Sequence, residues 1–163
     1  MTISGWTDPV TLDPAYNYES SGQAILLNVY DTLVFYAKDD PGSFVPQLAE
    51  EVPTLGNGGI SADGLRYTFQ IRQGVKFQDG SLLTPEDVAF TFQRNLLQGG
   101  YNSPQFLFTE PLLGIGRYDV GELVGDGSAA GDAAALARMS ASELSRVCEL
   151  VKSKIIPDNN RWT

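Results

Sequence analysis

The stretch VKFQDGSLLTPEDVAFTF, residues 75–92, places an alternating strand, a turn and a capped helix next to one another. Val75 and Phe77 are apolar and alternate with polar residues, as in a strand with one buried face. The dipeptide at 79–80, Asp-Gly, then favours a tight turn. The same alternation runs upstream, with apolar side chains at Leu65, Tyr67, Phe69 and Ile71. The sequence therefore predicts a half-buried strand, interrupted by one glycine, that ends in this turn.

A helix is predicted directly after the turn. Thr84 is placed to cap it, and Pro85 suits the first helical position. Glu86 and Asp87 complement the positive end of the helix dipole. Apolar side chains recur on one face, and others lie roughly opposite: Val88, Ala89, Phe92 and Leu96 against Phe90 and Leu97. We therefore expect this helix to be covered on two sides and to end at the glycines 99–100.

Two further helices are indicated by capping-box spacing, in which a serine precedes Gln or Glu by three residues. One begins near Ser20, with Gln23 as the partner, and the other follows Ser140, with Glu143 as the partner. The first is predicted to bury Ile25, Val29 and Leu33, with Leu26 and Tyr30 flanking them. The second is predicted to bury Leu144, Val147, Cys148 and Val151.

The remaining segments are predicted from turn residues and short apolar runs. Residues 33–52 predict a strand, a polar turn at 39–42 and a second apolar stretch, and 103–114 predict a short helix or an extended segment. Residues 119–137 are rich in Gly, Ala and Asp and predict a flexible insertion. KIIPDNNRWT, residues 154–163, predicts a hairpin turning at 157–160, whose first strand has an exposed edge.

Composition excludes several classes of function. The 163 residues include 20 acidic and 11 basic side chains, so the formal net charge is −9 and neither nucleic acid nor an anionic membrane is expected as a partner. The chain has no histidine, which removes histidine-based triads and metal sites, and its single cysteine cannot form an internal disulfide or a thiolate zinc site. We expect no cofactor and no metal. The start of the chain does not have the pattern of a signal peptide, and the apolar runs are far shorter than a membrane span.

Some residue types in this sequence act in catalysis or metal binding in other proteins, but here a structural role explains them better. Glu86 and Asp87 suit a helix N-terminus, and Glu50-Glu51 is a second adjacent pair without the spacing of a glycosidase. GDGSAAGD, residues 125–132, lacks the Lys-Ser/Thr of a phosphate cradle and the ligand spacing of a calcium loop. Cys148 lies on an apolar helical face. The aromatic residues in loop-like segments are equally compatible with surface packing and with a small-molecule site: Trp6, Tyr16, Tyr18 and Tyr101.

Taken together, four stretches resemble the family 5 extracellular solute-binding proteins. They are TLDPAYNYESSGQAILLNVYDTLVFY, FVPQLAEEV, DGLRYTFQIRQGVKFQDGSLLTPEDVAFTFQR and NSPQ, in the order of the family and covering residues 11 to 105. The terminal KIIPDNNRWT resembles a later hairpin of the same lobe.

The resemblance implies a mixed α/β fold, specifically a partial lobe of a type II periplasmic-binding-protein-like fold with a mixed sheet and packed helices. Residues 1–163 would form the N-terminal part of the first of two lobes that close on a solute. Compared with the family pattern, residues 1–163 are expected to lack the export signal, the second lobe, the hinge crossings and the return of the chain into the first lobe. The segment 119–137 is longer than usual.

The resemblance also implies a function that is not enzymatic, with no catalytic residue. It implies the substrate-binding component of an ABC importer, periplasmic or extracellular and membrane-associated in the parent protein. Its partners would be a peptide, nickel complex or oligosaccharide, the permease subunits and the remaining lobe of the same chain. By position in the family motifs, the ligand-binding residues would be Asn17, Tyr18, Glu19, Ser20 and Gln105.

Other functions stay open at this point. One is a stand-alone accessory of a carbohydrate-active enzyme that uses carboxylates and loop aromatics, and another is a free-standing interaction domain. An incomplete lobe is expected to bind ligand weakly and to dimerise through exposed strand edges.

Overall fold

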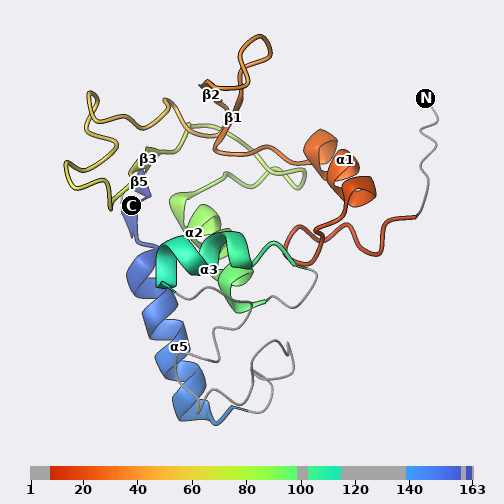
Figure 1. Ribbon diagram of the computed structural model, residues 1–163, viewed down its shortest axis with the longest axis vertical. Coiled ribbons are helices and arrows are strands. Elements are labelled where there is room, and N and C mark those ends of the chain that lie inside the picture. Colours follow the sequence, from red (N-terminus) through yellow and green to blue (C-terminus); the bar gives the residue numbers. More distant parts are fainter. Residues whose placement is uncertain (1–7, 99–102, 115–138, 159–160, 163) are drawn as a thin grey trace. The chain divides into compact units, whose positions relative to one another are not determined.

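The computed structural model describes residues 8–98, 103–114, 139–158 and 161–162 (Figure 1). The predicted insertion 119–137, the glycines 99–100 and the loop aromatics Trp6 and Tyr101 lie outside these residues. The chain divides into two compact units. Unit 1 comprises Met1–Tyr30 and Phe92–Lys154, and unit 2 comprises Asp31–Thr91 and Ile155–Thr163.

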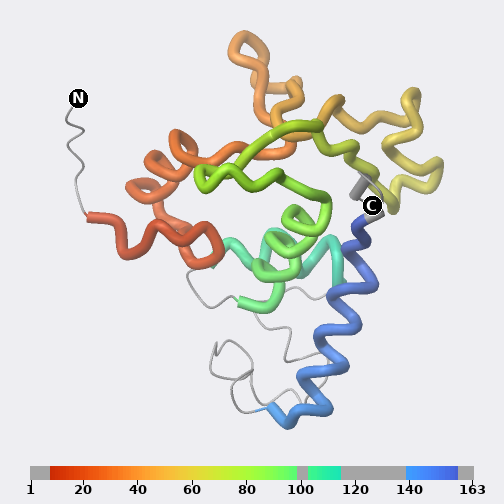
Figure 2. The backbone as a smooth tube through the Cα atoms, turned by 180° about the vertical axis from the view of Figure 1, so that it is seen from behind, coloured from red at the N-terminus to blue at the C-terminus, as the bar shows by residue number. Residues whose placement is uncertain are grey.

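Unit 2 begins with an antiparallel hairpin of β1 (Val34–Tyr36) and β2 (Phe44–Pro46), which is the orange segment that folds back on itself in Figure 2. Asp40 organises its turn, because its carboxylate accepts hydrogen bonds from the Gly42 amide at 3.0 Å and from the Ser43 hydroxyl. These bonds lower the pKa of Asp40, with the Ser43 hydroxyl as the main cause. The predicted strand, polar turn and second apolar stretch are confirmed.

A second sheet in unit 2 contains β3 (Phe69–Gln70), β4 (Pro157–Asp158) and β5 (Arg161–Trp162). The strand order is β3-β5-β4 and both pairings are antiparallel. The predicted C-terminal hairpin is confirmed. Its second strand, β5, lies in the middle of the sheet, and β3 and β4 are the outer strands among the described elements. The turn was predicted to begin at residue 157, which was wrong, since 157–158 belong to β4.

The long strand predicted around residue 70 is shorter than expected. Its backbone changes hydrogen-bonding partner every few residues: Thr68 N donates to Gly59 O, Gln70 O accepts from Glu50 N, and Arg72 N donates to Leu48 O. A continuous ladder therefore does not form, although bridges flank β3 on both sides. Ile71 is 1% exposed as predicted, whereas Leu65 is 84% exposed, so the prediction that it is buried was wrong.

The helix α2 (Pro85–Leu97) begins as its sequence predicts. Thr84 N and Thr84 Oγ1 donate to Asp87 Oδ2 at 2.8 and 2.9 Å, and Asp87 N returns a bond to Thr84 Oγ1 at 3.4 Å. Asp87 thus takes the place of the Glu in a capping box. The expected apolar face is buried at Val88, Ala89 and Leu96. Phe90 is 63% exposed, so the prediction that the helix is covered on two sides was wrong for that residue.

Unit 1 contains α1 (Ser20–Val29), α3 (Phe106–Leu113) and α5 (Ala141–Lys154), and α3 contacts α5 (Figure 1). The capping box of α5 is confirmed, because Ser140 N and Oγ donate to Glu143 Oε2 at 2.8 and 2.6 Å. Its predicted face is buried at Val147 and Val151. None of the helices in the described part of the chain has the length and apolar content needed to cross a bilayer.

The predictions for α1 were wrong in two respects. Its N-cap residue is Glu19, without a side-chain cap bond, so Ser20 and Gln23 form no capping box. Gln23 Nε2 instead donates to Asn17 O at 3.3 Å. The buried residues of α1 are Gly22 and Leu26, whereas Val29 is exposed and Leu33 lies beyond the end of the helix.

The Thr84 cap provides a direct test of this helix start. We expect Thr84→Ala to lower the free energy of unfolding by about 1 kcal/mol, because the first-turn amides and Asp87 lose their partner. Urea unfolding monitored by circular dichroism measures the change. Thr91→Ala is the matched control, since the exposed Thr91 hydroxyl bonds Asp87 O within the helix and caps nothing. Equal losses in the two variants would contradict the capping role.

Candidate functional site

The predicted ligand-binding residues follow a turn that Asp13 organises. Asp13 O accepts hydrogen bonds from Tyr16 N at 3.0 Å and Asn17 N at 2.9 Å, and Asp13 Oδ1 accepts from Ala15 N at 3.0 Å. We call residues 13–19 the Asp13 loop. A carboxylate that bonds the backbone two residues ahead mimics a turn, which explains why the chain folds back here.

Arg94, in the last turn of α2, holds the Asp13 loop. Its Nη1 donates to Asp13 Oδ1 at 2.7 Å and its Nη2 donates to Asp13 Oδ2, so the pair is bidentate. Both side chains are about a third exposed. The pKa of Asp13 is lowered mainly because Arg94 donates to the carboxylate, against a smaller opposing effect of burial. The same bond raises the pKa of Arg94.

Asn17 is buried, with 1% of its surface exposed, and its side chain is used inside the loop. Its Nδ2 donates to Thr11 O at 2.8 Å and to Glu19 Oε1 at 3.3 Å. The amide lies directly over Gly22, because a Cβ atom on Gly22 would be 1.9 Å from Asn17 Nδ2. Among the described residues, Asn17 Oδ1 has no hydrogen-bond donor.

Glu19 and Ser20 lie where the loop enters α1. Glu19 Oε1 accepts a hydrogen bond from Val10 N at 2.6 Å, which ties the preceding segment to the loop. Ser20 is exposed and is the first residue of α1. The carboxylate of Glu19 therefore has one oxygen engaged with backbone and side-chain donors of its own segment.

Gln105 lies on the second predicted segment and is buried, with 2% of its surface exposed. Its Nε2 donates to Leu96 O at 2.6 Å, in the same turn of α2 that carries Arg94. Its backbone oxygen accepts from Phe108 N and Thr109 N and so starts α3. Gln105 Oε1 has no donor within the described residues.

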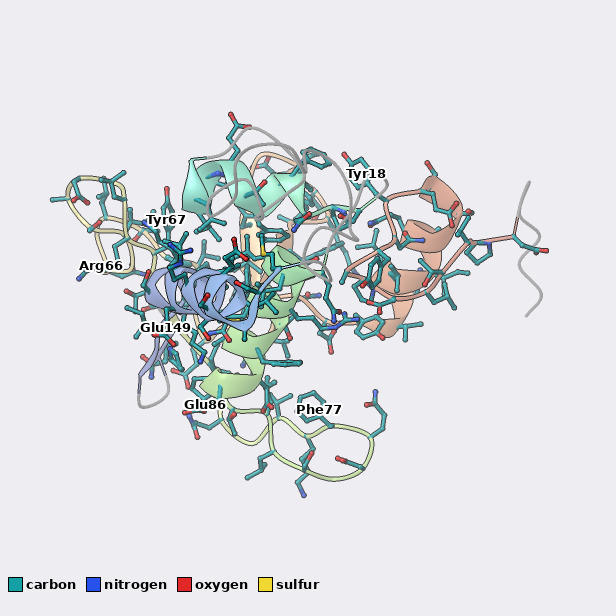
Figure 3. All side chains as sticks on the ribbon, turned by 90° about the horizontal axis from the view of Figure 1, so that it is seen from below. Tyr18, Arg66, Tyr67, Phe77, Glu86 and Glu149 are labelled. Carbon is teal, nitrogen blue, oxygen red and sulfur yellow. The ribbon has the colours of Figure 1, made fainter. Side chains whose placement is uncertain are left out.

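The two predicted segments meet through an aromatic pair. The rings of Tyr18 and Phe106 contact edge to face, with their centroids 5.2 Å apart at 89°. Tyr18 is 53% exposed and lies on the segment that leads into α1 (Figure 3). The structure thus brings the residue after Asn17 against the residue after Gln105. Exposed aromatic side chains on loops are a common lining of small-molecule sites, so Tyr18 is a candidate contact for a solute.

The other candidate groups take part in local structure. Asp87 belongs to the α2 cap, and Glu86 is exposed at the start of that helix (Figure 3). Glu50 and Glu51 are exposed, and Cys148 is partly buried on α5. Within the described ranges, no three acidic or cysteine side chains gather as a metal site would require.

Sequence reasoning missed three residues that shape the site. Arg94 bonds a residue 81 positions away, so no local pattern reveals it. Phe106 contacts Tyr18 across a similar separation in the chain. Gly22 did carry a signal, because an isolated glycine inside a helical pattern indicates that something packs closely against the helix.

Comparison with known proteins gives a family match. Residues 43–137 match the profile described as bacterial extracellular solute-binding proteins, family 5 Middle. A di/tripeptide-binding protein 2 from Pseudomonas aeruginosa is 37% identical over 97 residues, which are 55% of this chain and 16% of that protein. A probable deoxycholate-binding periplasmic protein from Escherichia coli is 35% identical, over 54% of this chain and 15% of that protein.

A third relative is a probable D,D-dipeptide-binding periplasmic protein from Escherichia coli, 32% identical over 61% of this chain and 19% of that protein. The chain therefore spans less than a fifth of the length of these relatives. No solved structure matches the chain.

The ion pair at the Asp13 loop predicts a dependence of stability on pH. The folded-state pKa of Asp13 lies below its ordinary value of 3.8. The pair therefore stabilises the fold fully above that value, and this contribution disappears as the pH falls through the folded-state pKa. We expect the gap in unfolding free energy between the wild type and Asp13→Asn to be widest at neutral pH and to close in acid.

Urea unfolding of both proteins across the acid range measures this gap. In an Arg94→Gln background the gap should be smaller and should depend less on pH, because the main donor that lowers the pKa of Asp13 is gone and only the Ala15 amide remains. A gap that stays constant with pH in the wild-type background would show that Asp13 does not titrate as the ion pair requires.

Proposed function

The chain belongs to the bacterial extracellular solute-binding proteins of family 5, and from this premise we propose that it supplies part of the ligand site of an ABC importer receptor. In this proposal residues 1–163 are the N-terminal part of the first lobe. A solute binds between this lobe and a second one, and contacts to both lobes favour the closed state. The permease subunits then recognise the closed receptor. The receptor works in the periplasm or outside the cell.

The observation that carries the proposal is the contact between Tyr18 and Phe106. It joins the two segments in which the family motifs predict ligand contacts, and it leaves Tyr18 half exposed. Aromatic side chains on loops that a scaffold holds in place are a common lining of solute sites. We propose Tyr18 as the direct contact, with Glu19 and Ser20 beside it at the start of α1.

Asn17 and Gln105, which are buried, are proposed to hold the segments of Tyr18 and Phe106 in place. Each uses its amide nitrogen within the fold and keeps a carbonyl oxygen for which the described residues provide no donor. Glu19 carries a negative charge beside Tyr18, which favours the amino group of a peptide over an anionic solute. Two of the relatives named above are described as binding dipeptides or tripeptides.

Nothing in the proposed mechanism requires chemical catalysis. A receptor must bind, close and release, and the free energy for closure comes from the difference in ligand contacts between the open and closed states. The carboxylates that an enzyme would use are partly engaged in turns and caps, as at Asp40 and Asp87.

An interaction domain is the alternative that a specific observation supports. On the β1–β2 hairpin the exposed rings of Tyr36 and Phe44 lie with centroids 5.2 Å apart. Exposed paired aromatics are typical of protein-binding surfaces.

Sequencing the coding DNA past codon 163 separates the two functions. A reading frame that continues for several hundred codons supports the receptor, and a stop codon supports the free-standing domain. Dimerisation through strand edges stays a prediction.

The receptor proposal predicts that ligand binding needs more than this chain. We expect residues 1–163 to bind trialanine weakly or not at all in isothermal titration calorimetry, because one lobe supplies only part of the contacts. The continuous protein encoded by the extended frame should bind it measurably. Tight binding by residues 1–163 alone would contradict the two-lobe mechanism.

The aromatic contact predicts a specific loss of affinity in the extended protein. Tyr18→Ala should weaken trialanine binding about tenfold, which corresponds to about 1.4 kcal/mol. Glu19→Ala and Gln105→Ala should weaken it in the same direction. Tyr67→Ala is the matched control, because Tyr67 is similarly exposed, at 49%, and lies on a loop of unit 2 (Figure 3). If Tyr18→Ala, Glu19→Ala and Gln105→Ala all keep wild-type affinity, as the control should, the assignment of this surface is wrong.

A further inference from the structure

We propose that Arg94 is a positioning residue of the ligand site, which fixes the Asp13 loop so that Tyr18 and Glu19 are presented in one geometry. This inference rests on the proposed function, because it assigns to Arg94 a role in the site described there. Arg94 itself is not assigned to touch the solute.

The first step of the argument is the bond between Arg94 and Asp13. Two parallel N–H···O bonds between a guanidinium and a carboxylate fix both distance and orientation. The pair spans 81 residues and both side chains are partly buried. It therefore constrains the loop in a way that a single exposed ion pair does not.

The second step is what Asp13 does with the same atoms. Asp13 Oδ1 receives both Arg94 Nη1 and the backbone amide of Ala15, at 2.7 and 3.0 Å. The backbone oxygen of Asp13 receives the amides of Tyr16 and Asn17. Arg94 thus holds the residue from which the whole turn is built. A shift of Asp13 would be passed directly to Asn17 and to Tyr18 after it.

The third step is the other end of the loop, where Gly22 provides a matching constraint. The Asn17 side chain occupies the space of a Cβ atom at position 22, so the loop can close on α1 only if residue 22 is glycine. Gln23 Nε2 adds a bond to Asn17 O at 3.3 Å. The Asp13 loop is therefore clamped by Arg94 at its start and by the Asn17–Gly22 contact at its end.

The fourth step joins this clamp to the second ligand segment. Leu96 O, two residues after Arg94, accepts the Gln105 Nε2 bond. One turn of α2 thus holds both predicted segments, and the Tyr18–Phe106 contact forms between them. Loss of the Arg94 bonds should release one segment while the other stays bound to the helix.

Hydrogen exchange of residues 1–163 tests the positioning role without any ligand. In Arg94→Gln and Asp13→Asn, the amides of Ala15, Tyr16 and Asn17 should exchange at least tenfold faster, because their acceptor is no longer held. The double variant should add little, since the two side chains act as one unit. Amides of α5 around Val147 and Val151 should keep their protection, which separates loop release from general destabilisation.

Arg72→Gln is the matched control. Arg72 also bonds backbone oxygens across the fold, with Nε 2.9 Å from Gln47 O, but it lies in unit 2. It should leave exchange in the Asp13 loop unchanged. Arg94→Lys keeps the charge but loses the planar fork, so it should restore protection only in part. Unchanged exchange of the loop in Arg94→Gln would overturn the inference.

Trialanine affinity of the extended protein completes the test. Arg94→Gln should weaken binding about tenfold and Arg72→Gln should not. If exchange rises in the loop but affinity is unchanged, Arg94 has a structural role only and the inference is wrong. If the wild type does not bind trialanine, the proposed peptide ligand fails, while the exchange experiment still decides whether Arg94 positions the loop.

Discussion

The last turn of α2 holds both segments of the candidate site. Its Arg94 side chain binds Asp13, and its Leu96 backbone oxygen accepts a hydrogen bond from Gln105. Carbonyl groups at the end of a helix lack partners within the helix, so a side-chain amide that reaches one satisfies a group that would otherwise need water. Because both segments are bound to the same rigid turn, Tyr18 and Phe106 meet at 5.2 Å.

The start of α2 and the position of Arg94 at its end are connected through the helix. The Thr84–Asp87 cap sets where α2 begins, and the apolar positions Val88, Ala89 and Leu96 set which face is buried. With start and rotation fixed, the directions of the side chains in the last turn follow from the helical repeat. Residues 75–92 therefore help to set the direction of Arg94 at the far end of the helix, where it bonds Asp13.

Local patterns predicted what depends on neighbouring residues. The caps of α2 and α5, the β1–β2 hairpin and the C-terminal hairpin are confirmed, because each is defined by residues within a few positions of one another. The errors at Leu65, Phe90 and Val29 share a cause, since periodicity shows that a residue is apolar but not whether the described chain covers it. At α1 the alternative bonds of Gln23 to Asn17 and of Glu19 to Val10 replaced the expected capping box. The family motifs predicted five ligand-binding residues, which stay a prediction, whereas the ion pair and the Gly22 contact could be found only in the structure.

The polarity of the buried amides is the feature that packing alone explains least. Leu or Met would fill a similar volume to Gln105 without a polar atom to satisfy, and an unpaired buried acceptor is destabilising by about 1–3 kcal/mol. Asn17 and Gln105 each retain such an acceptor beside the Tyr18–Phe106 contact, and Asn95 Oδ1, in the same turn of α2, is a third within the described residues. The amide nitrogens give a reason for polar side chains at two of these positions, because Asn17 Nδ2 bonds Thr11 O and Gln105 Nε2 bonds Leu96 O. Each of these bonds fixes a segment that an apolar side chain would leave free to move, so the fold itself gives a use to the amide group.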